Sequence, residues 1–96
     1  MIIPDINLLL YAYDTDSPFH PRAGAWWQDC LSGTEPVGLL HVVVFGFLRV
    51  ATNARAFKSP MTVDEAAGQV RSWLRQPPVQ VFPAWPDQHE PRVEVL

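Results

Sequence analysis

Several features that would mark a familiar kind of site are missing from the sequence. It has a single cysteine, Cys30, so no disulfide can form within the chain, and this favours a reducing cytoplasm. The three histidines, His20, His41 and His89, have no zinc-ligand spacing with one another or with Cys30. Walker, dinucleotide-binding and Gly-x-Ser-x-Gly motifs do not occur. The sequence therefore does not support a disulfide scaffold, a zinc site, a P-loop or a serine hydrolase.

An excess of positive charge and long apolar runs are also missing. The formal net charge is −3, so a polyanionic substrate would need a bound metal or a local basic patch, for which Arg49, Arg55 and Lys58 are candidates. The apolar N-terminus has no basic residues, and Asp5 and Asn7 interrupt it well short of a membrane span. We therefore expect no signal peptide, no membrane contact and a cytoplasmic location.

The sequence does contain enough apolar side chains for one small domain. Its 96 residues are 48% hydrophobic and 18% charged, and four Trp with five Phe make much of the expected core aromatic. Residues 1–83 are interpreted as this domain. Five prolines lie between residues 77 and 91. Residues 84–96 are therefore expected to be an irregular tail at the start of a missing C-terminal part.

Hydrophobic spacing predicts the helices and strands. The chain begins with a strand and a short helix, and a second helix ends at residues 32–33. Trp26, Trp27 and Cys30 have the spacing of one buried helical face, so the tryptophans are interpreted as core and not as a base-stacking platform. Residues 37–40 are predicted to be a strand.

The second half of the chain continues the alternation. The apolar run over residues 42–51 is ambiguous, and its length favours a helix that is buried all round. A capping box formed by Thr62 and Glu65 starts the next helix, and residues 79–82 are predicted to be a third strand. The order strand-helix-helix-strand-helix-helix-strand is that of an α/β protein with a parallel sheet.

Asp5 and Asn7 are the first candidate site residues. Ligands of open parallel sheets bind beyond the carboxyl ends of strands, which is where Asp5 is expected. In an extended stretch the two side chains would lie on one face, so Asp5 can bind a hard cation while Asn7 orients its surroundings. The alternative is that Asp5 is only a helix N-cap.

A second set of candidates lies at a predicted helix end, expected near the same edge of the sheet. These residues can contact RNA or phosphate, although Arg49 can equally pair with an internal carboxylate. The set comprises Arg49, Thr52, Asn53 and Arg55.

Several segments, taken together and in order, resemble the PIN-domain family, and specifically the VapC-type toxin ribonucleases. The resemblance covers roughly residues 1–83. It rests on Ile3-Pro4-Asp5-Ile6-Asn7-Leu8-Leu9-Leu10-Tyr11-Ala12, Trp26-Trp27, Phe47-Leu48-Arg49-Val50-Ala51-Thr52-Asn53 and Leu74-Arg75-Gln76-Pro77.

This resemblance implies a Mg²⁺- or Mn²⁺-dependent endoribonuclease that acts on RNA and is neutralised by a VapB-like antitoxin. It implies three or four acids around the metal, of which Asp5 matches the first as metal ligand and catalytic residue. At the position aligned with the second acid this chain has Gly46. The later acids are missing, since Asp87 and Glu90, like Glu94, lie among prolines and polar residues.

The resemblance also implies a PIN-like parallel sheet of which three strands of the usual five are present. Loss of the distal strands would leave the first strand as an edge, which predicts poor solubility, misfolding or a homodimer that covers it. A competing interpretation is a catalytically inactive, truncated PIN fragment that only binds, and so sequesters, antitoxin. A remnant of a damaged reading frame with no function is the third.

Overall fold

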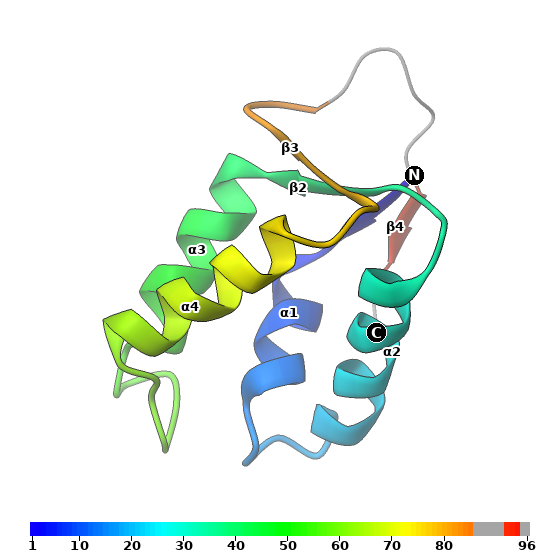
Figure 1. Cartoon of the computed structure of the whole chain (residues 1–96). Coiled ribbons are helices and arrows are strands. Elements are labelled where there is room, and N and C mark those ends of the chain that lie inside the picture. The colour runs from blue at the N-terminus through cyan, green and yellow to red at the C-terminus, as the bar shows by residue number, and fades with distance from the viewer. Residues whose placement is uncertain (86–91, 95–96) are drawn as a thin grey trace.

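The computed structural model describes residues 1–85 and 92–94. Figure 1 shows helices and strands alternating along the chain, which confirms the expected α/β architecture with a parallel sheet. In chain order the elements are β1 (Ile2–Pro4), α1 (Ile6–Tyr13), α2 (His20–Ser32), β2 (Val37–Leu40), α3 (His41–Ala51), α4 (Val63–Leu74), β3 (Val79–Phe82) and β4 (Arg92–Glu94).

The strands form one sheet in the order β3-β2-β1-β4, and each neighbouring pair is parallel. Ile2 of β1 lies opposite Val37 of β2, and on the other side of β1 Pro4 lies opposite Glu94 of β4. The three predicted strands are confirmed, and β4 is an addition to them. The expectation that β1 is an edge was wrong, because β4 pairs with it, and a homodimer is no longer needed to cover that edge.

The strand β4 lies inside the tail that composition sets apart. Its backbone continues the sheet beside β1, so Glu94 is placed in a strand and not in an irregular segment. The domain boundary at residue 83 stays a prediction. Asp87, His89 and Glu90 lie outside the described residues.

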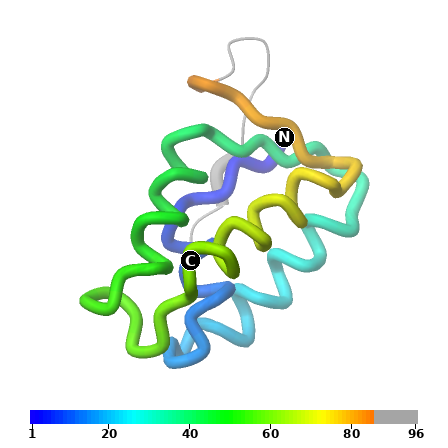
Figure 2. Tube along the Cα trace, turned by 60° about the vertical axis from the view of Figure 1, so that its left-hand side comes forward, coloured from blue at the N-terminus to red at the C-terminus, as the bar shows by residue number. Residues whose placement is uncertain are grey.

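All four helices contribute to one buried cluster against the sheet. Ile2, Val37 and Leu39 supply the strand side of this cluster, and each helix adds buried apolar side chains to it. Figure 2 shows α4 between α3 and α2. The core therefore sits between the helices and one face of the sheet, which leaves the carboxyl ends of β1 and β2 free to connect directly into α1 and α3.

At the centre of the core, four aromatic rings meet, one from each helix. The ring of Trp73 lies 4.8 Å from that of Phe47, 5.5 Å from that of Trp27 and 5.7 Å from that of Tyr13, measured between centroids. Trp73 Nε1 donates a hydrogen bond of 2.7 Å to the Tyr13 hydroxyl. Burial raises the pKa of that hydroxyl, while the hydrogen bond opposes the shift. Trp27 is buried as predicted, and Trp26 is half-buried beside it.

The two later helices differ in how well local sequence describes them. The capping box of α4 is confirmed, since Thr62 and Glu65 exchange both hydrogen bonds. The helix α3 is confirmed as a helix, but the expectation that it is buried all round was wrong, because Val42 and Phe45 are exposed. None of the helices in the described part of the chain is long and apolar enough to cross a membrane.

We predict that Tyr13→Phe destabilises the protein by about 1–3 kcal/mol, because Trp73 Nε1 would be left buried without an acceptor. Urea denaturation followed by tryptophan fluorescence measures this loss. Tyr11→Phe is the matched control, since no hydrogen bond of the Tyr11 hydroxyl is present among the described residues. Equal stability of the two variants would contradict the prediction.

Candidate functional site

Asp5 lies where β1 turns into α1, at the carboxyl end of an internal strand (Figure 1). It is the N-cap residue of α1, and its backbone carbonyl accepts hydrogen bonds from the amides of Leu8 and Leu9. Its side chain makes no capping hydrogen bond. Over residues 1–85 and 92–94 no hydrogen bond or ion pair of the Asp5 carboxylate is present. The N-cap alternative thus accounts for the position of Asp5, whose carboxylate also suits the positive end of the α1 dipole without a bond to the described residues.

Asn7 does not lie in an extended stretch. The strand ends at Pro4 and α1 begins at Ile6, so Asn7 is an exposed residue in the first turn of the helix. The argument that Asp5 and Asn7 share one face of a strand was therefore wrong, because alternation between faces stops where the helix starts. An orienting role for Asn7 stays a prediction.

Gly46 brings α3 against the start of α1. It is buried, and a Cβ atom at this position would meet Cδ1 of Ile6 more closely than van der Waals contact allows. At Gly46, the position aligned with the second acid, α3 therefore approaches α1 closely. The residue that it approaches is Ile6, which directly follows Asp5 in the sequence. In the described part of the chain no group of three or more His, Cys, Asp or Glu side chains could hold a metal ion.

The donor set near Asp5 suits one kind of cation only. Asp5 is a partly exposed carboxylate with no partner among residues 1–85 and 92–94, which would suit Mg²⁺ or Mn²⁺ that keeps most of its waters. It does not fit an ion held by protein ligands alone, since Gly46 has no side chain to contribute. Metal binding by Asp5 stays a prediction.

The second candidate set is divided by its local hydrogen bonds. Thr52 Oγ1 donates to the carbonyl of Leu48 at 2.7 Å, and the backbone amide of Arg55 donates to Asn53 Oδ1 at 2.9 Å. Thr52 and Asn53 thus shape the end of α3 and the following turn. Arg49 and Arg55 are exposed, and their guanidinium groups make no hydrogen bond or ion pair among the described residues.

The placement of this set was also predicted wrongly. The helix α3 begins directly after β2, at the carboxyl edge of the sheet, and its 11 residues span about 16 Å. Its C-terminal end therefore lies away from that edge (Figure 1), and Asn53 and Arg55 follow that end in the sequence. Arg49 is closer, because it follows Gly46 by less than one turn of helix.

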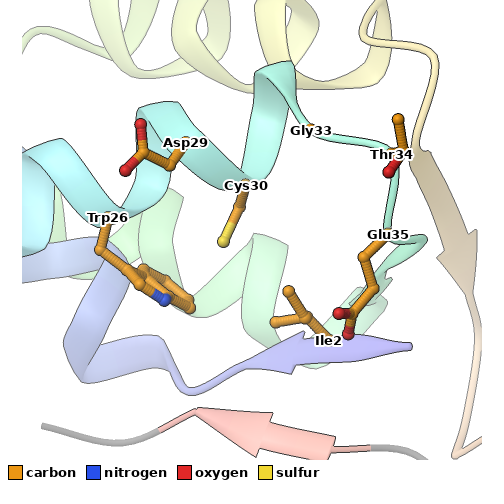
Figure 3. A pocket seen from close by; sticks show the side chains of 7 residues that line it. All are labelled: Ile2, Trp26, Asp29, Cys30, Gly33, Thr34 and Glu35. Atoms are coloured by element: carbon orange, nitrogen blue, oxygen red, sulfur yellow. The ribbon is translucent and has the colours of Figure 1, made fainter.

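A pocket of about 310 Å³ opens at the other end of β1. Figure 3 shows Trp26, Cys30 and Ile2 pointing toward one another beneath α2. The pocket is completed by Asp29, Gly33, Thr34 and Glu35. Glu35 also lies 3.9 Å from the N-terminal amine. Because Ile2 is at the amino end of β1 and Asp5 follows its carboxyl end, this pocket is not part of the candidate metal site.

The close approach at Gly46 predicts different effects on stability for two glycine substitutions. Gly68→Ala, where a Cβ meets nothing within 4 Å, should stabilise the protein by about 0.5–1 kcal/mol through helix propensity. Gly46→Ala should bring a smaller gain or a small loss, because the added Cβ displaces Cδ1 at the end of the Ile6 side chain and this offsets the gain in helix propensity. Urea denaturation measures both.

A double variant separates this steric effect from others. Ile6→Val removes Cδ1, so Gly46→Ala should be more favourable to stability in the Ile6→Val background than in the parent chain. An equal effect in both backgrounds would show that Ile6 is not the obstacle.

Comparison with known proteins adds a sequence relationship. No family model matches the chain. It is 52% identical over 86 residues to "Ribonuclease VapC33" of Mycobacterium tuberculosis, a match that covers 90% of this chain and 60% of that protein. Over 77 residues it is 39% identical to "Ribonuclease VapC37" and 35% identical to "Ribonuclease VapC31" of the same organism, covering 80% of this chain and 54% of each.

These matches are long in this chain and partial in its relatives. The chain spans little more than half of the length of the curated relatives that it matches. The matching region includes most of the described helices and strands. The chain is therefore a relative of the VapC ribonucleases over about nine-tenths of its length, which confirms the resemblance seen in its sequence.

Proposed function

We propose that this chain is the toxin component of a type II toxin–antitoxin pair and acts as a metal-dependent endoribonuclease. The observation that carries the proposal is the carboxylate of Asp5, which has no partner among the described residues and lies at the carboxyl end of an internal strand. The names of its relatives, which are VapC ribonucleases, support RNA as the substrate. A VapB-like antitoxin is the proposed protein partner.

In this proposal each site residue has a separate task. Asp5 binds Mg²⁺ or Mn²⁺, and Asn7 orients its surroundings. When bound, such an ion polarises a phosphodiester and helps to activate water. Arg49 and Arg55 contact RNA phosphates, because both are exposed cations. Thr52 and Asn53 support these arginines, because their side-chain hydrogen bonds stabilise the end of α3 and the turn that follows it.

A second candidate function is binding of antitoxin without catalysis. Gly46 supplies no ligand, and the described residues hold no group of three metal-binding side chains. These two observations favour an inactive chain that sequesters antitoxin.

We expect the folded protein to cleave labelled single-stranded RNA in the presence of Mn²⁺. Asp5→Asn should reduce the rate at least about 100-fold, because the metal ligand is lost, and EDTA should have the same effect. Asp64→Asn is the matched control, since Asp64 is an exposed carboxylate in the first turn of α4. Cleavage that survives Asp5→Asn would contradict the role of Asp5.

Absence of cleavage by wild-type protein with native circular dichroism would overturn the enzymatic proposal. The second candidate function then predicts that co-expression of this chain with a VapC-type toxin and its antitoxin increases growth inhibition, because antitoxin is removed from the active toxin. Unchanged growth in that experiment would argue against sequestration.

A further inference from the structure

The outer face of α3 exposes large apolar side chains next to a cation. Val42 is 71% exposed and Phe45 is 65% exposed. Arg49, also exposed, follows Phe45 by four residues. Side chains three and four residues apart lie side by side on a helix, so these three form one stripe. We call Val42, Phe45 and Arg49 the α3 stripe.

The α3 stripe lies beside the candidate metal site. Phe45 precedes Gly46, and Gly46 packs against Ile6, the residue that follows Asp5. The helix α3 also begins at the carboxyl edge of the sheet, where Asp5 lies. A polymer bound at Asp5 would thus pass close to the stripe.

The segment of sequence that contains α3 differs in charge from the whole chain. Between Glu35 and Asp64 the sequence has no Asp or Glu, although the chain has 10 of them. The same interval holds three of the seven Lys and Arg residues, namely Arg49, Arg55 and Lys58. All of α3 falls within it. Arg49 gives the α3 stripe itself one exposed positive charge and no negative one, which is complementary to a phosphate group.

The ring of Phe45 contacts a neighbouring ring and remains accessible to solvent. The centroid of its ring lies 6.1 Å from that of His41, with an interplanar angle of 65°. His41 is itself exposed, so the contact leaves the Phe45 ring accessible. An exposed aromatic ring beside cations is the arrangement with which proteins bind single-stranded nucleic acid, because every base has a face that can stack.

We propose that Phe45 is a base-stacking platform for single-stranded RNA and that Arg49 contacts a neighbouring phosphate. This inference rests on the proposed function and adds a substrate-binding residue to it. Stacking does not read the identity of a base, so the α3 stripe positions the strand at Asp5 without selecting a sequence. By binding the RNA, Phe45 positions the strand relative to the metal site.

The test measures RNA binding apart from cleavage. Fluorescence anisotropy of a labelled single-stranded oligonucleotide is recorded in EDTA, so that no turnover occurs. Phe45→Leu keeps apolar area but removes the aromatic face, and it should weaken binding at least about fivefold. Phe45→Trp should retain wild-type affinity. Phe19→Leu is the matched control, because Phe19 is 45% exposed and lies before α2, outside the stripe.

Each outcome decides for or against the platform. Weakening by Phe45→Leu, with affinity retained in Phe45→Trp and Phe19→Leu, supports it even if the wild type does not cleave RNA. Equal affinities of all four proteins overturn it even if cleavage depends on Asp5. Sedimentation velocity is run alongside, and a change of oligomeric state in Phe45→Leu without a change in RNA affinity assigns the stripe to self-association and overturns the proposal.

Discussion

The packing of Trp73 is the interaction on which the rest of the structure depends. Its ring contacts rings from α1, α2 and α3, and its own helix is the fourth. Helices of 8 to 13 residues are marginal in isolation, so their positions are set by such tertiary contacts. The bond from Trp73 to Tyr13 fixes the C-terminal end of α1. Because α1 has only eight residues, that contact also restrains Asp5 at its other end.

The close packing of the helices is accompanied by a shortage of metal ligands at the candidate site. At Gly46 the helices α1 and α3 approach so closely that no side chain fits beside Ile6 as it stands. The close contact defines where α1 starts, and thereby the direction in which the chain leaves β1 at Asp5. Position 46 is a glycine, so it cannot contribute a carboxylate to a metal bound near Asp5.

Sequence predicted those features that depend on neighbouring residues. The capping box at Thr62 is local, and the burial of Trp27 follows from helical spacing, so both could be found. The positions of residues and strands in space could not be predicted in this way. The strand β1 has only three residues, so Asn7 falls in the helix that follows it. The strand β4 pairs with β1 although most of the sequence separates them. Apolar content also does not reveal which face of α3 is covered, because that depends on where the other helices pack.

A metal site with one protein carboxylate must acquire affinity from its substrate. If Asp5 holds Mg²⁺ or Mn²⁺ as proposed, phosphate oxygens would complete its donor set, so metal and RNA should each bind more tightly in the presence of the other. Contacts that bind RNA at some distance from the metal then strengthen metal binding without adding a ligand. Phe45 and Arg49 lie on the helix that packs against the start of α1, where such contacts are effective. If Asp5 is functional, the exposed face of α3 compensates for the acid that Gly46 cannot supply.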